Sequence, residues 1–122
     1  LDLGQDPMPL ATEALRGEGA VLVNSSGERF MQGLHPLAEL APRDVVARAI
    51  FRERAAGRRV FLDARAALGA SFRDRFPTVY AACRNAGLDP TTQPMPVAPA
   101  AHYHMGGIAV DARGRSSVAG LW

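Results

Sequence analysis

Apolar residues recur along the chain at two spacings, one typical of helices and the other of strands. Helical spacing over residues 42–56 predicts an amphipathic helix that opens on a proline and is followed by a glycine. A second helical run extends from Phe72 to Gly87, with Ser71 as its expected cap and Pro77 as the point where it restarts. The two runs therefore predict two longer helices, each with one apolar face.

Short runs rich in β-forming residues predict strands at residues 20–23, 60–62 and 108–110. Turn-forming residues follow the first and third runs, so we expect two hairpins whose returning strands lie at 29–30 and 117–122. The remaining segments are predicted as a short helical turn at 11–16, loops at 1–9 and 31–41, and an extended proline-rich stretch at 91–99. This order of elements predicts an α+β fold with short antiparallel strands and two to three helices.

The composition is ordinary for a soluble globular domain, with 48% apolar and 21% charged residues. No apolar run approaches the roughly 18 residues of a membrane helix, and residues 1–10 lack the basic start of a signal peptide. We therefore expect no membrane association. Because the chain opens on Leu1 and ends on Trp122, we expect it to be a piece of a longer protein.

The fourteen basic residues are all arginines. They are spread along the chain and interleaved with acids, as at 52–54 and 73–75, which is typical of solvated helix faces and not of a phosphate-binding track. Codon bias in a GC-rich genome explains them more simply, so we expect no nucleic-acid partner. The single cysteine, Cys83, cannot form an internal disulfide, which fits a reducing, cytoplasmic setting. Its place between Ala82 and Arg84 in a helical pattern favours a small core or boundary residue.

Two short segments carry charged residues that could form a site. Glu13 and Arg16 are three positions apart, so one helical turn brings their side chains to the same face, although a simple surface ion pair would look the same. Arg43 follows a proline in the first turn of a helix, where its planar guanidinium can bind a carboxylate with two hydrogen bonds. The alternative is an ordinary charged helix start, in which Asp44 complements the helix dipole.

The segment from His102 to Gly107 carries a third candidate site. His102 and His104 would lie on one face of a strand, but no cysteine or carboxylate stands nearby at ligand spacing, so we expect no metal. Gly106 and Gly107 lack side chains, so a flat ligand could approach the backbone closely there. A bulge or a turn that enters a strand would explain the same glycines.

The order of four segments is more specific than any one of them. These segments are residues 12–20, 24–31, 39–50 and 96–108. In this order they resemble the flavoprotein family of succinate dehydrogenase, fumarate reductase and L-aspartate oxidase, and the resemblance covers essentially the whole chain. The stretches at 15–19 and 40–43 look most similar to the L-aspartate oxidases.

The resemblance implies a capping domain that closes over a dicarboxylate substrate. It implies that residues 1–95 form this domain and that residues 96–122 return toward an FAD-binding domain of Rossmann type. Arg43 would be the central catalytic residue, and Glu13 and Arg16 would form a proton path to it.

The resemblance also assigns the remaining site residues. Thr12 and His102 would bind substrate carboxylates, and Gly106 and Gly107 would lie near the flavin. We expect FAD in the full-length enzyme but none on this chain alone, because the amino-terminal glycine-rich dinucleotide fingerprint is absent.

The implied activity is a flavin-dependent oxidation of L-aspartate to iminosuccinate, at the start of NAD biosynthesis in the cytoplasm. A quinolinate synthase would be a partner of the full-length enzyme, and the piece alone could self-associate. One alternative is the equivalent segment of a succinate dehydrogenase or fumarate reductase flavoprotein subunit. A second alternative is a binding module without catalytic activity.

Overall fold

The computed structural model describes residues 1–11, 13–100 and 107–122. Its centre is a three-stranded antiparallel sheet in the order β1-β2-β3. The strands are β1 (Val21–Asn24), β2 (Val60–Asp63) and β3 (Met95–Pro96). All three lie in or next to the runs expected to be extended, and the α+β fold class is confirmed.

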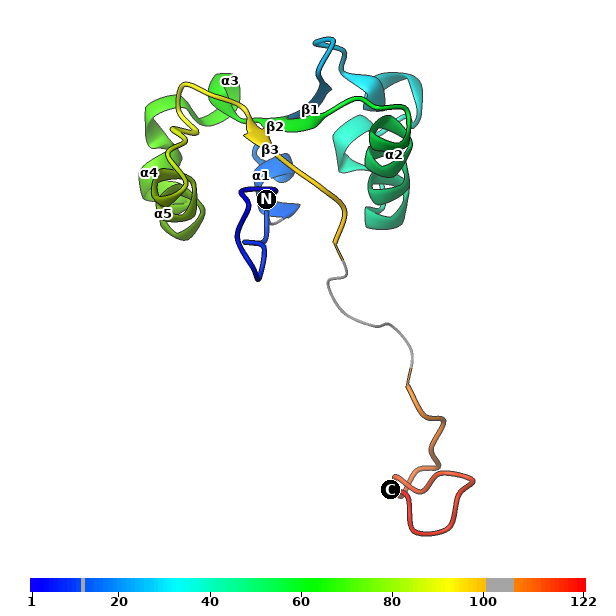
Figure 1. Cartoon of the computed structure of the whole chain (residues 1–122). Helices are drawn as coiled ribbons and strands as arrows, with labels where there is room; N and C mark the ends of the chain where they lie inside the picture. The colour runs from blue at the N-terminus through cyan, green and yellow to red at the C-terminus, as the bar shows by residue number, and fades with distance from the viewer. Residues whose placement is uncertain (12, 101–106) are drawn as a thin grey trace.

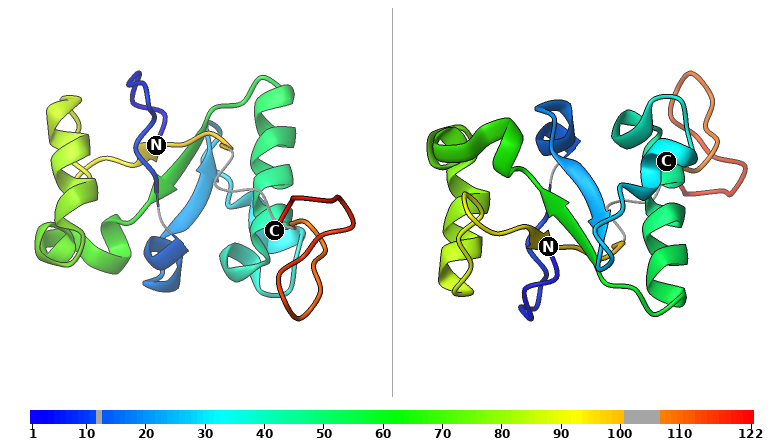
Figure 2. Two further views of the ribbon diagram at one scale, coloured as in Figure 1. Left: turned by 90° about the horizontal axis from the view of Figure 1, so that it is seen from below. Right: turned by 90° about the horizontal axis from the view of Figure 1, so that it is seen from above.

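Helices flank this sheet on two sides. The α-helices are α1 (Glu13–Gly17), α2 (Arg43–Ala55), α3 (Arg65–Leu68), α4 (Phe72–Arg75) and α5 (Pro77–Asn85). Short 3₁₀ turns are η1 (Phe30–Gly33), η2 (Ala38–Leu40) and η3 (Gly69–Ser71). Figure 1 shows α2 on one side and α3 to α5 on the other, with the amino-terminal segment and α1 between them. The two views in Figure 2 show the same arrangement around the strands.

The core begins with one row of the sheet. Leu22 lies opposite Leu62, which lies opposite Met95, and all three side chains are buried. Leu15 from α1 and Phe72 from α4 are fully buried in the same apolar cluster. Removing a large apolar side chain from water stabilises the fold by about 1.5–3 kcal/mol. The core therefore joins the sheet to helices from both halves of the chain.

The two longer helices lie where the sequence predicts them. α2 begins directly after Pro42, whose φ is −49°, and the glycine beyond its end, Gly57, has a φ of 77°. α5 starts at Pro77, and Gly87 after it also has a φ of 77°. The prediction that Ser71 caps a helix is wrong, because its hydroxyl donates to the Leu68 carbonyl at 2.7 Å from within a 3₁₀ turn.

The predicted hairpin at 20–30 is wrong. The Asn24 side-chain oxygen accepts the backbone N–H groups of Ser26 and Glu28, each at 3.0 Å, which closes a tight turn. The chain then enters η1 instead of a returning strand, and β1 pairs with β2. The two residues at 29–30 are too few to compete with the longer apolar run of β2 as a partner.

The predicted hairpin near the carboxyl end is wrong as well. The expected turn is present, since the Gly114 N–H donates to the Asp111 carbonyl at 2.9 Å, but neither flanking run forms a strand. Ile108, Val110 and Trp122 are exposed. A lone two-stranded ribbon is marginal without a surface to cover its apolar face, and the described residues provide none here.

Cys83 is fully buried in the core, as the sequence predicts. Burial raises the pKa of its thiol, so the cysteine is a packing residue. Within the described ranges, no helix is both long enough and apolar enough to span a membrane.

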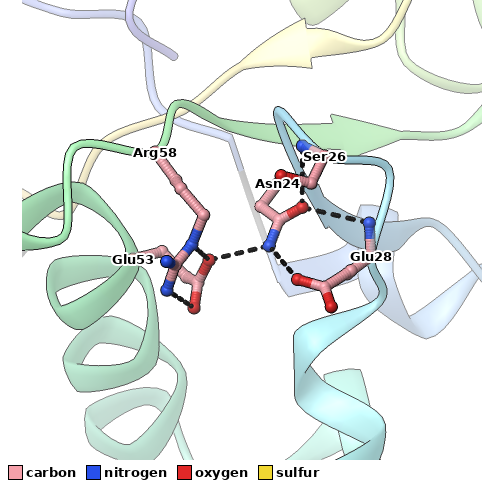
Figure 3. Close-up of polar contacts among 5 residues, drawn as sticks. All are labelled: Asn24, Ser26, Glu28, Glu53 and Arg58. Carbon is pink, nitrogen blue, oxygen red and sulfur yellow. Dashed lines mark hydrogen bonds and ion pairs between the residues drawn. The ribbon is translucent and has the colours of Figure 1, made fainter.

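A buried asparagine ties β1 to the far end of α2 (Figure 3). The Asn24 amide nitrogen donates to Glu28 and to Glu53, each at 2.9 Å. Arg58 adds a fork to Glu53, with its Nε and Nη2 donating at 2.6 and 2.9 Å. The amide therefore bridges two carboxylates that would otherwise repel each other.

The substitution Asn24→Asp tests this bridge. It keeps the oxygen that closes the turn but replaces the donor with a third carboxylate. We expect a loss of roughly 2–3 kcal/mol in unfolding free energy at neutral pH. The pKa of the new carboxyl is raised in the folded state, so the penalty shrinks as the pH falls through that value. Chemical denaturation at several pH values measures this, with Ser26→Ala as the neutral control because Ser26 uses only its backbone N–H.

Candidate active site

Folding brings together charged residues that lie thirty positions apart in the sequence. Glu13 is the first residue of α1 and Arg43 is the first residue of α2. The Arg43 Nε donates to the Glu13 Oε2 at 2.5 Å. The closeness expected from the sequence resemblance is therefore present.

Arg16 completes the cluster from the other end of α1. Its Nη2 lies 3.9 Å from the Glu13 Oε1, and its Nη1 donates to the main-chain carbonyl of Glu39 in η2. The Arg16 side chain is only 11% exposed. The Glu13 carboxylate thus stands between two guanidinium groups, one largely buried and one open to solvent.

Each guanidinium affects the titration of its neighbours. The hydrogen bond from Arg43 lowers the pKa of Glu13, the charges of Arg43 and Arg16 add to this, and desolvation opposes it. Burial lowers the pKa of Arg16, and the charge of Glu13 partly offsets that effect. Glu13 is therefore ionised at neutral pH, and Arg16 is the arginine of the cluster that loses most hydration.

The cluster opens onto a hollow of about 360 Å³. Most of the described residues that line it are apolar, and the charged side chains among them are Glu13, Arg16 and Arg43. Its walls come from the amino-terminal segment, α1, the first half of α2, the strand row and residues 97–100. Fixed charges act more strongly beside an apolar wall than in open water, so the hollow favours an anionic ligand with a small apolar body.

Several predicted site residues lie outside the described residues, namely Thr12, His102 and Gly106, together with His104. Gly107 is described. Its φ of 155° favours glycine, and a Cβ added there would meet nothing within 4 Å. Among the described residues, no group of three or more potential metal ligands lies together.

One buried residue next to the cluster was not predicted as part of a site. Glu39 is 5% exposed. Burial alone would raise its pKa, but hydrogen bonds from Arg29 and from backbone N–H groups, including that of Leu22, lower the pKa overall. Glu39 is therefore a buried carboxylate held in its charged form. The sequence gives little sign of this, because Glu39 is an acid in a loop segment.

Comparisons with known proteins identify the family of the chain. The family model described as FAD binding domain matches residues 2–122. The L-aspartate oxidase of Caulobacter vibrioides is 62% identical over 122 residues, which cover 100% of this chain and 24% of that protein. The L-aspartate oxidase of Mesorhizobium japonicum is 60% identical with the same coverage. The chain thus spans about a quarter of the length of the curated relatives it matches.

A solved structure supports the fold independently. The structure titled quinol-fumarate reductase with menaquinol molecules is similar to this chain with a TM-score of 0.77 and 35% sequence identity. The match covers 93% of this chain and 23% of that chain. The same α+β arrangement therefore occurs inside a larger protein.

Removing the Arg43 guanidinium should raise the pKa of Glu13. In Arg43→Ala, Glu13 loses the hydrogen bond that contributes most to its lowered pKa, so its titration moves up toward the ordinary value. A lowered folded-state pKa stabilises the fold above the unfolded pKa, and this contribution is lost as the pH falls through the folded value. Carboxyl ¹³C NMR, assigned with Glu13→Gln, measures the shift.

The matched control is Arg48→Ala. Arg48 lies on the same helix and pairs with Asp44 at 2.5 Å instead of with Glu13. A Glu13 titration curve that is the same in wild type and in Arg43→Ala would contradict the pairing.

Proposed function

We propose, from the premise that this chain belongs to the FAD binding domain family, that it is the substrate-capping part of a flavin-dependent L-aspartate oxidase. The full-length protein would oxidise L-aspartate to iminosuccinate. The observation that carries the proposal is the 60–62% identity to L-aspartate oxidases across the whole chain. The Glu13, Arg16 and Arg43 cluster on one hollow supports it, because a dicarboxylate needs cationic groups at its ends.

The second candidate is a flavoprotein subunit of a succinate dehydrogenase or fumarate reductase. The likeness in fold to a quinol-fumarate reductase favours it, but the sequence identity is 35% there against 62% for an L-aspartate oxidase. The difference favours L-aspartate as the substrate.

Arg43 is proposed to hold a substrate carboxylate with its planar guanidinium. α2 begins behind a proline, so the backbone that carries Arg43 is fixed, and its Nε bond to Glu13 limits rotation of the side chain. The apolar lining of the hollow would strengthen the attraction between opposite charges on the side of the substrate that faces it. Orientation and charge are thus supplied by the same side chain.

Oxidation of L-aspartate to its imine removes a hydride from Cα and a proton from the amino group. FAD, when bound, accepts the hydride. We propose the row Arg16, Glu13 and Arg43 as a proton path. Arg43 is hydrogen-bonded to Glu13 at 2.5 Å, whereas Arg16 and Glu13 form an ion pair at 3.9 Å that must shorten before a proton can pass. The substrate amino group can also lose its proton without this row, whereas in the fumarate-reducing direction the row would deliver a proton to carbon.

The other residues complete the proposed site from outside the described cluster. Thr12 and His102 would bind substrate carboxylates, and Gly106 and Gly107 would lie beside the flavin ring, where the absence of a side chain lets a flat ligand approach the backbone. We propose residues 1–95 as the capping domain and 96–122 as the returning segment. Its exposed apolar side chains, among them Trp122, would then pack on the rest of the FAD-binding domain.

Partners and location follow from the same proposal. A quinolinate synthase would take up the product, and the setting would be the cytoplasm, which agrees with an unpaired, buried Cys83. Without the rest of the FAD-binding domain, the exposed apolar residues of 107–122 would favour self-association of the chain.

The substrate is tested by anaerobic flavin reduction in the full-length protein loaded with FAD. We expect L-aspartate to bleach the flavin absorbance and succinate to leave it essentially unchanged. Reduction by succinate and not by L-aspartate would support the second candidate, a succinate dehydrogenase or fumarate reductase flavoprotein subunit. Reduction by neither would remove the proposed enzyme activity.

Arg43→Lys should slow flavin reduction by L-aspartate about 100-fold, because lysine keeps the charge but loses the fork that orients a carboxylate. FAD should stay bound at one equivalent, measured by its absorbance after gel filtration. Arg48→Lys is the control, since Arg48 is an exposed arginine one turn further along α2 that pairs with Asp44. Near-normal reduction in Arg43→Lys would remove Arg43 from the catalytic role.

A further inference from the structure

Glu39 is held at the outer edge of the sheet by fixed donors. Its Oε1 accepts the backbone N–H of Leu22 at 3.3 Å, and within the described residues β1 is an edge strand that pairs with β2 alone. Arg29 binds the same carboxylate with two hydrogen bonds. Its Nη2 donates to Oε2 at 3.0 Å and its Nε donates to Oε1 at 3.3 Å. The side chain therefore connects β1 to the turn η2 and to the segment before η1.

The turn that carries Glu39 contacts Arg16 through its backbone and leads along the chain into Arg43. The Glu39 carbonyl accepts from the Arg16 Nη1, and four residues later Arg43 starts α2. Ala38 in the same turn has a φ of 44°, an unfavourable value for a residue with a Cβ. A strained turn of this kind persists only when surrounding contacts hold it.

We propose that Glu39 is a positioning residue for the active site, because its carboxylate fixes the turn that orients Arg16 and leads into Arg43. Glu39 does not occur among the described residues that line the hollow, so it would act through the two arginines and not on substrate. This inference rests on the proposed function, since it takes the Arg16, Glu13 and Arg43 cluster as the site.

The chain contains a matched control for Glu39. Glu53 also accepts a fork from an arginine, Arg58, and one further N–H, from Asn24 (Figure 3). The side-chain exposures are 7% for Glu39 and 13% for Glu53, and both arginines are 40% exposed. Glu53 lies ten residues beyond Arg43 on α2, about 15 Å along the helix axis.

The test compares Glu39→Gln with Glu53→Gln in the full-length protein loaded with FAD. Both substitutions keep the side-chain shape and should lower the melting temperature to a similar degree. We expect kcat for L-aspartate oxidation to fall about 10- to 100-fold in E39Q only, with KM little changed, because misplaced groups reduce the rate of the chemical step. A kcat in E39Q within twofold of that in E53Q would overturn the proposal.

A double-mutant cycle distinguishes positioning from general destabilisation. If Glu39 acts through Arg16, then adding E39Q to Arg16→Lys lowers kcat little further, and the effects are far from additive. Fully additive effects on kcat would show that Glu39 acts independently of Arg16, which overturns its positioning role through that arginine.

A second readout does not depend on the reaction. If E39Q releases Arg16 and Arg43, the pKa of Glu13 rises, whereas the loss of a nearby negative charge by itself would lower it. An upward shift in E39Q and none in E53Q supports the positioning role even if L-aspartate is not the substrate. An unchanged or lowered Glu13 pKa in E39Q overturns it, whatever the substrate is.

Discussion

The hydrogen bonds that Glu39 accepts are the constraint around which this part of the molecule is arranged. A carboxylate withdrawn from water needs fixed donors, and it finds them in the Leu22 N–H and the Arg29 guanidinium. The same bonds satisfy an N–H at the open edge of β1, which would otherwise lie unpaired beside the core. The turn before α2 is therefore fixed to the sheet before the helix begins.

The far end of α2 is fixed to the same strand by different chemistry. Asn24 at the end of β1 donates to Glu53 near the end of the helix, and Arg58 holds that carboxylate in place. α2 is thus connected to β1 at both ends, once through η2 and once through an amide. The hollow lies beside the first part of α2, so the connection through η2 is the one that bears on the position of Arg43, and the amide holds the helix at its far end, away from the hollow.

Sequence patterns predicted the parts of the fold that depend on local chemistry. Prolines and glycines mark both ends of α2 and α5, and the run at 60–62 is apolar enough to require a strand. The hairpins failed because strand pairing depends on partners distant in sequence. β1 pairs with a strand almost forty residues away, and the turn at Asn24 leads into η1 and not into a returning strand.

The candidate site could be predicted only in part from the sequence. Glu13, Arg16 and Arg43 were found through the order of motifs, and the structure brings them together. Glu39 was missed because burial around it is the opposite of what residue type predicts. Leu37 and Leu40 are more than half exposed while the acid between them is buried, and only tertiary contacts can produce that arrangement.

The exposed fractions of Glu13, Arg16 and Arg43 show how little this cluster contributes to the stability of the fold. The Glu13 and Arg43 side chains are 45% and 56% exposed, and exposed ion pairs of this kind contribute little to folding. Arg16 is different, because burial removes hydration from its charge and lowers its pKa. A fold under selection for stability alone gains little from an arginine buried beside an apolar hollow. In the proposed function, the same burial leaves the charge of Arg16 beside Glu13 with few competing water molecules, which is where the attraction between opposite charges is strongest.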